Sequence, residues 1–233
     1  MAEELEIFIN IASVRARISA AARRVGREPE EVLLVAVSKT IAPEKVNQAL
    51  AAGITDLGEN YLQEALLKQP QITGPARWHY IGHLQRNKAK QAVEAFDLIQ
   101  SVDNLALVQE LSKRAVALGK TASILLQVNT SGEASKSGVT PTELMKLAEA
   151  VSQLPNLQVQ GLMTIGRFAP DPQVARAEFR LLAGLFRELA QRRLPNIEMK
   201  WLSMGMSHDF EVAIEEGANL VRVGTAIFGA RRP

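Results

Sequence analysis

Short runs of apolar residues alternate with amphipathic segments along the chain. The clearest run, from Leu33 to Val37, has five consecutive apolar residues and is rich in branched side chains. This run predicts a strand buried on both faces, as in a parallel sheet. It ends at Ser38-Lys39-Thr40, and Pro43 then fits the first turn of a helix over 44–52. A lysine therefore lies where a buried strand gives way to a loop, the end at which α/β proteins place their chemistry.

The same order of strand and helix recurs eight times. Strands are predicted at 32–37, 54–57, 78–81, 98–102, 123–128, 157–163, 199–202 and 220–223. Helices are predicted at 4–25, 44–52, 61–67, 87–95, 104–118, 140–153, 171–193 and 211–216, with a short helical tail after Gly224-Thr225. Asn104 is expected to cap its helix, and Gly58-Glu59-Asn60 is expected to form a turn.

Eight β/α units in 233 residues predict a (β/α)8 TIM barrel with an extra N-terminal helix. No linker-like composition interrupts the alternation, so we expect one domain over residues 1–233. An open doubly wound sheet is the alternative, because it would show the same alternation. A barrel would place the carboxyl ends of all eight strands on one rim.

Composition narrows the function. The chain has 27 basic and 25 acidic residues, a formal net charge of +2, which does not demand nucleic acid or a membrane surface. The basic segment around Arg86-Asn87-Lys88 lacks interleaved aromatic residues and is expected to be a solvated helix face. There is no cysteine, and His79 and His83 have no evident third ligand, so no metal site is expected. The acidic N-terminus is unlike a signal peptide, so we expect a cytoplasmic protein.

Most of the residues at or just after the ends of the predicted strands are polar, and a barrel would gather these positions around one cavity. They are Lys39, Glu59, Asn60, His83, Ser101, Asp103, Asn129, Ser131, Met163, Thr164, Ser203, Ser207, Arg222, Gly224 and Thr225. The loops after strands seven and eight contain glycine and open helices, which is typical of a phosphate site in barrels. A lysine opposite such a site can bind charge or form a Schiff base, so a Schiff-base aldolase and a pyridoxal phosphate protein remain open.

Seven segments together resemble the pyridoxal phosphate homeostasis proteins, a family of barrels related to the N-terminal domain of alanine racemase. The segments are 36–40 (AVSKT), 58–64 (GENYLQE), 78–88 (WHYIGHLQRNK), 129–138, 161–164 (GLMT), 202–207 (LSMGMS) and 222–229 (RVGTAIFG). They cover the chain nearly end to end and in order, so their combination is specific although each is weak alone.

The resemblance implies a cofactor, pyridoxal 5′-phosphate (PLP), held as a Schiff base on Lys39. It implies that Ser207, Gly224 and Thr225 hold the phosphate, that Asn60 lies beside the cofactor and that Arg222 faces the pyridine nitrogen. Met163 and Ser203, at the ends of their strands, complete the expected cofactor-binding set.

Family members are generally described as carriers or regulators of cofactor and amino-acid pools, so we expect PLP homeostasis without catalytic residues. PLP-dependent apo-enzymes are possible recipients, and a monomer is expected because the rim residues come from one chain. Alanine racemases recruit a tyrosine from a second domain or subunit, and we expect no second domain here. Neither Tyr61 nor Tyr80 is an obvious substitute. A PLP-dependent enzyme, such as a weak amino-acid racemase, is the alternative.

Overall fold

Eight parallel strands close into a barrel in the computed structural model, which describes residues 2–133, 136–167 and 169–229. Each strand pairs with its neighbours in sequence, and β1 pairs with β8, so the barrel prediction is confirmed over the open sheet. The strands are β1 (Leu33–Val37), β2 (Asp56–Glu59), β3 (Arg77–Tyr80), β4 (Leu98–Val102), β5 (Ala122–Gln127), β6 (Leu157–Met163), β7 (Ile197–Ser203) and β8 (Leu220–Val223).

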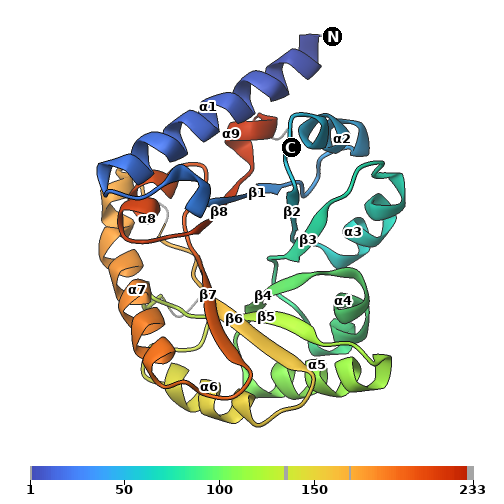
Figure 1. Cartoon of the computed structure of the whole chain (residues 1–233). Helices are drawn as coiled ribbons and strands as arrows, with labels where there is room; N and C mark the ends of the chain where they lie inside the picture. Colours follow the sequence, from blue (N-terminus) through green and yellow to red (C-terminus); the bar gives the residue numbers. More distant parts are fainter. Residues whose placement is uncertain (1, 134–135, 168, 230–233) are drawn as a thin grey trace.

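Helices surround the barrel, as Figure 1 shows in a view along its axis. They are α1 (Ala2–Arg24), α2 (Pro43–Ala51), α3 (Leu62–Lys68), α4 (Ala89–Ala95), α5 (Leu105–Leu118), α6 (Leu144–Ser152), α7 (Arg176–Gln191), α8 (Phe210–Glu215) and α9 (Thr225–Phe228). Short 3-10 helices are η1 (Pro29–Glu31), η2 (Gln69–Gln71), η3 (Arg86–Lys88) and η4 (Pro172–Ala175). In the described part of the chain, no helix is long and apolar enough to cross a membrane.

The additional N-terminal helix is present as predicted. Helix α1 lies against α8, α9 and α2, and its N-terminal end extends beyond the barrel in Figure 1. Ile7, Ile11, Val14 and Ile18 are buried on one face of this helix, which places its apolar stripe against the outer helices.

Local signals fix several element boundaries. Asn104 caps α5, because its side chain accepts a hydrogen bond from the Leu107 backbone N–H at 2.9 Å. Gly119 ends the same helix in the left-handed conformation, with a φ of 62°. Pro43 is the first residue of α2, as the sequence predicts.

The predicted turn at Gly58-Glu59-Asn60 is wrong, because Gly58 and Glu59 are the last two residues of β2. The predicted strand over 54–57 is therefore displaced by two residues. A Cβ on Gly58 would lie 3.1 Å from side-chain atoms of both Ile81 and Val35. This glycine makes room for its neighbours in the barrel and does not form a turn.

Two sets of buried side chains fill the molecule. The main core lies largely between the strands and the helices. A second apolar cluster has one residue from each of five strands: Val35, Leu98, Leu125, Met163 and Leu220. Gln100 lies two residues after Leu98 in β4, and Arg222 lies two residues after Leu220 in β8, so both point to the same side of their strands as the apolar cluster. The barrel interior is therefore apolar in one layer and polar in the next.

Candidate functional site

A cavity of about 360 Å³ opens at the carboxyl ends of the strands. Its lining residues come from the ends of β1, β2, β3, β6, β7 and β8 or the loops after them: Val37, Lys39, Asn60, Ile81, Ile165, Met206, Ser207, His208, Arg222, Gly224 and Thr225. Six of the eight residues predicted to bind the cofactor are in this lining, namely Lys39, Asn60, Ser207, Arg222, Gly224 and Thr225. The barrel thus brings together residues that lie up to 186 positions apart, from 39 to 225.

Met163 and Ser203 do not line the cavity. Met163 is fully buried in the apolar layer of the barrel interior. Ser203 is also fully buried, and it contacts Arg222 from below the cavity. Sequence reasoning did not select the apolar wall residues Val37, Ile81, Ile165 and Met206, or His208. Their positions at or directly after the strand ends are the signal in the sequence that could have identified them.

Arg222 is buried, with only 4% of its surface exposed, and its guanidinium is held by two hydrogen bonds. Its Nη1 donates to Ser203 Oγ at 2.5 Å, and its Nη2 donates to the Thr164 carbonyl at 2.8 Å. Burial lowers the pKa of Arg222 to about 10, against the opposing charge of Asp209. Arg222 therefore remains positively charged at neutral pH, and two of its five N–H groups are committed to these partners.

A chain of buried hydrogen bonds runs from Arg222 through the barrel interior. Ser203 Oγ donates to Gln100 Oε1 at 2.6 Å, and Gln100 Nε2 lies 2.8 Å from His79 Nδ1. His79 Nε2 lies 2.8 Å from Asp56 Oδ1. Because Ser203 donates to the amide oxygen, the amide nitrogen must donate to Nδ1, which assigns the proton of His79 to Nε2. Ser203 Oγ therefore connects Arg222 to this network, while the Thr164 carbonyl holds the second guanidinium nitrogen.

His79 is thus occupied by the interior network, in keeping with the structural role predicted for the pair with His83. His83 is exposed in the loop after β3. Within the described residues, no group of three or more histidine, cysteine, aspartate and glutamate side chains is placed to hold a metal ion.

Ser207 joins the loops after β7 and β8. Its Oγ accepts long hydrogen bonds from the backbone N–H groups of Gly224, at 3.2 Å, and Ala226, at 3.4 Å. The hydroxyl proton of Ser207 is then available to a ligand. Helix α9 has only four residues. An anion here would be held by N–H and hydroxyl groups and not by a helix dipole.

Asn60 supplies an unsatisfied acceptor at the cavity. Its Oδ1 is buried and has no hydrogen-bond partner. Asn60 also lines a second cavity of about 220 Å³, which shares Ile81 and Ile165 with the first and includes His83 and Lys136. A buried acceptor without a partner is rare in folded proteins, so a ligand that donates a hydrogen bond here would remove an energetic penalty.

The two tyrosines contribute to neither cavity. Tyr61 is 56% exposed. Tyr80 is buried, donates to the His83 carbonyl at 3.1 Å and packs edge-on against Phe96. Burial raises the pKa of Tyr80, so its hydroxyl stays protonated.

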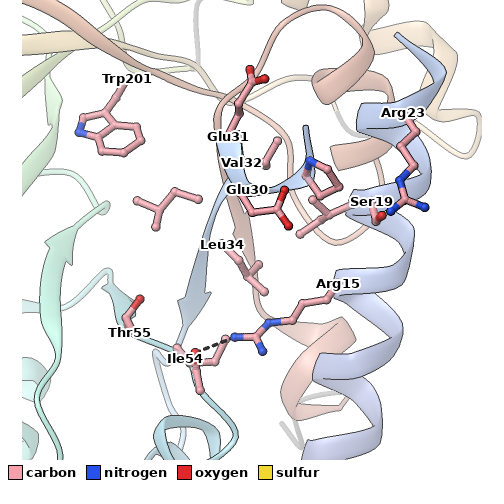
Figure 2. Close-up of a pocket in the computed structure, with 14 residues that line it drawn as sticks. Arg15, Ser19, Arg23, Glu30, Glu31, Val32, Leu34, Ile54, Thr55 and Trp201 are labelled. Carbon is pink, nitrogen blue, oxygen red and sulfur yellow. Dashed lines mark hydrogen bonds between the residues drawn. The ribbon is translucent and has the colours of Figure 1, made fainter. Parts of the chain in front are cut away.

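A larger cavity of about 590 Å³ lies at the opposite end of the barrel, between α1 and the residues that precede β1 and β2 (Figure 2). Arg15, Arg23, Thr55 and Trp201 are among its lining residues. Arg15 donates to the Gly53 carbonyl at 2.6 Å. None of the described lining residues is a lysine, and active sites of (β/α)8 barrels lie at the other end, so we assign the candidate site to the smaller cavity.

Comparison with known proteins shows the class of the fold. Residues 9–232 match the family model of the alanine racemase N-terminal domain. The alanine racemase of Clostridium difficile 630 has a TM-score of 0.74 at 16% identity; the match covers 98% of this chain and 56% of the racemase, and it shows the fold alone. Fold and cavity together therefore define a barrel of the alanine racemase N-terminal domain type with a lysine at the end of β1.

Two relatives define the family more closely. The pyridoxal phosphate homeostasis protein of Pseudomonas aeruginosa is 50% identical over 223 residues, which cover 95% of this chain and 94% of that protein. PipY of Synechococcus elongatus PCC7942, solved with PLP bound, has a TM-score of 0.84 at 37% identity and covers 96% of this chain and 100% of its own. The chain belongs to the pyridoxal phosphate homeostasis protein family, as the motifs predict.

Proposed function

We propose that this chain binds PLP in the carboxyl-end cavity, as a Schiff base on Lys39, and serves PLP homeostasis as a carrier or regulator. The observation that carries the proposal is the convergence of a lysine, a buried arginine, a serine hydroxyl and an unpartnered amide oxygen on one cavity. The structure of PipY with PLP bound, and the name of the Pseudomonas relative, support it.

The lining residues fit the chemical groups of PLP. Bound PLP supplies an aldehyde that condenses with a primary amine, and a ring that withdraws electrons. Lys39, half-buried at the end of β1, provides the amine. Ser207 and Thr225 provide hydroxyl donors for the phosphate, and Gly224, whose N–H makes only a long 3.2 Å bond to Ser207 Oγ, lies beside them in the cavity wall. The unpartnered Oδ1 of Asn60 provides an acceptor.

Arg222 would face the pyridine nitrogen. A guanidinium that stays charged at neutral pH donates a hydrogen bond there and disfavours a second positive charge on the ring. An unprotonated ring is a weaker electron sink, so this residue keeps the site chemically quiet. That property suits a protein that stores or delivers a cofactor.

A weak amino-acid racemase is the second candidate function. A racemase needs proton donors and acceptors on both faces of its cofactor. His208 is the observation in favour of this candidate, because it lines the cavity and its Nε2 lies 2.8 Å from the Ala169 carbonyl. We favour the carrier because the buried hydroxyl of Tyr80 is directed to a backbone carbonyl and Tyr61 lies outside the lining.

The test begins with the purified protein and added PLP. We expect a visible absorption band that disappears on borohydride reduction and leaves the cofactor attached. Absence of such a band would contradict PLP binding and would favour a Schiff-base aldolase without a cofactor. Prolonged incubation of the loaded protein with L-alanine should leave the enantiomer unchanged, whereas racemisation that disappears in His208→Ala would establish the enzyme.

The expected partners and state are part of the proposal. The cavity is lined by one chain, so we propose a monomer, which sedimentation of the loaded protein would check. We also propose cytoplasmic PLP-dependent apo-enzymes as recipients, to be sought by pull-down with cofactor-loaded protein.

A further inference from the structure

A second lysine lies buried behind the strand end that carries Lys39. Lys68, in the last turn of α3, is 4% exposed. Its Nζ donates to Glu59 Oε1 and Glu64 Oε1, each at 2.7 Å, and to the Ser38 carbonyl at 2.6 Å. We call Lys68, Glu59 and Glu64 the Lys68 cluster.

Both chain neighbours of Lys39 are held by this cluster. The Ser38 carbonyl accepts a hydrogen bond from Lys68 Nζ, and Ser38 Oγ donates to Glu59 Oε1 at 2.7 Å. On the other side, the Thr40 backbone N–H donates to Glu64 Oε1 at 2.5 Å. The cluster thus fixes the residues immediately before and after the proposed Schiff-base lysine.

Thr40 shows that this segment is not in a relaxed conformation. Its φ is 61°, in the left-handed region that β-branched residues avoid. Such a conformation persists only when surrounding contacts enforce it, and strain of this kind is concentrated at functional sites. The bond from Thr40 to Glu64 is a contact of that kind.

The Lys68 ammonium is suited to holding and not to reacting. Its Nζ donates to three acceptors, two of them carboxylate oxygens, so the nitrogen is fully engaged by these contacts and is not directed into the cavity. Buried ion pairs are poor sources of net stability, because desolvation offsets their attraction. Positioning of the segment 38–40 therefore explains this cluster better than a contribution to the stability of the fold does.

We propose that Lys68 and Glu64 are positioning residues for Lys39. By fixing Ser38 and Thr40, they direct the Lys39 amine into the cavity and so speed formation of its covalent bond to the cofactor. This inference rests on the proposed function, in which Lys39 is the residue that bonds to PLP.

Glu64→Ala is the sharpest test, because it removes the acceptor of the Thr40 N–H and leaves Lys68 paired with Glu59 and Ser38. Two quantities are measured. The first is the rate of covalent bond formation at saturating PLP, followed by the growth of the visible band. The second is the affinity for 4′-deoxypyridoxine 5′-phosphate, measured by calorimetry, since this analogue lacks the aldehyde and cannot bond to lysine.

Positioning predicts that the rate falls on the order of tenfold in Glu64→Ala, while the affinity for the analogue stays within about twofold. Lys68→Arg, which keeps the charge, should retain more of the rate than Lys68→Met. If Lys68→Met does not fold, Glu64→Ala alone decides. The matched control is Glu94→Ala, which removes the carboxylate of an exposed pair with Lys90 on α4 and should change neither quantity.

An unchanged rate in Glu64→Ala would overturn the inference. So would an equal loss of rate and analogue affinity, because the cluster would then merely support the cavity. Failure of the proposed function is seen separately: the parent protein would form no borohydride-stable adduct on the peptide that contains Lys39.

Discussion

The two ends of the barrel both have a cavity, and the larger one, about 590 Å³ against about 360 Å³, is not the site that we propose. At the amino end Arg15 donates to the Gly53 carbonyl and Thr55 donates to Asp56, and no described lining residue has a buried side-chain N or O atom without a partner. At the carboxyl end Asn60 Oδ1 is buried without a partner. Unsatisfied polar atoms beside a strand-end lysine therefore indicate a ligand site better than the volume of a cavity does.

Strand β2 shows the same contrast within four residues. Burial favours the neutral form of Asp56, but hydrogen bonds from His79 and Thr55 and the charge of Arg77 keep its pKa below its usual 3.8. Burial raises the pKa of Glu59 above its usual 4.5, although Lys68 and Ser38 oppose this shift. The amino-end carboxylate is fully supported, whereas at the carboxyl end Glu59 Oε2 has no hydrogen-bond partner.

The largest effect should come from the phosphate donors of the carboxyl end. Ser207→Ala should weaken PLP binding by about 1.5–3 kcal/mol, which is roughly a 10- to 150-fold loss, because one charge-assisted hydrogen bond is removed. Titration of the visible band measures it. Pyridoxal, which lacks the phosphate, should bind parent and variant almost equally, and an equal loss with both vitamers would contradict the assignment.

Arg222→Glu should have the next largest effect. A carboxylate at this position favours the protonated pyridine ring and makes removal of the α-proton of a bound amino acid easier, by about tenfold or 1.4 kcal/mol. Exchange of that proton into deuterated water is measured at matched cofactor occupancy. Ser203→Ala is the control, since it frees one bond of Arg222 and keeps its charge. A Glu variant no faster than the parent would contradict the role given to Arg222.

The two carboxylates of β2 should give opposite pH dependences of stability. Asp56 has a lowered pKa in the folded state, so its contribution is present above pH 3.8 and is lost as the pH falls through the lowered value. The deficit of Asp56→Asn should therefore grow as the pH rises from the lowered value through 3.8, and it should stay constant from there to neutrality. Glu59 has a raised pKa, so ionisation weakens the fold as the pH rises above 4.5, and any deficit of Glu59→Gln should shrink in the same direction. Denaturant unfolding at several pH values measures both deficits in the free energy of unfolding. Deficits that change with pH in the same direction in the two variants would contradict this prediction.

The smallest effect should come from the amino-end cavity. Arg15→Ala should leave PLP affinity within about twofold of the parent and reduce the free energy of unfolding by about 1 kcal/mol or less, since it removes one exposed hydrogen bond. Calorimetry with PLP and denaturant unfolding check the two quantities. A loss of PLP affinity would show that the larger cavity takes part in binding.

Sequence patterning predicts this barrel because each buried strand is a distinct apolar run. β4, β6 and β8 begin and end at the predicted residues. The end of β2 was missed because Gly58 suggests a turn, and its packing against Ile81 and Val35 becomes visible only when the barrel closes.

Motifs at strand ends predict the cavity residues for a similar reason, since the carboxyl ends of barrel strands always meet. The supporting contacts could not be predicted in this way. Gln100 and His79 lie within strands, and their hydrogen bonds connect β2, β3, β4 and β7 across the interior. From the sequence alone, Lys68 is a polar residue near the end of a helix and would be expected to be exposed. Only the packing of α3 shows that it is buried.

The most direct test of the account is to find the lysine that carries the cofactor. PLP-loaded protein is reduced with borohydride, digested and analysed by mass spectrometry, in the parent and in Lys39→Ala. We expect the phosphopyridoxyl mass on Lys39 in the parent, and neither the adduct nor the visible band in Lys39→Ala. An adduct on another lysine of the parent, or a band and adduct that persist in Lys39→Ala, would contradict it.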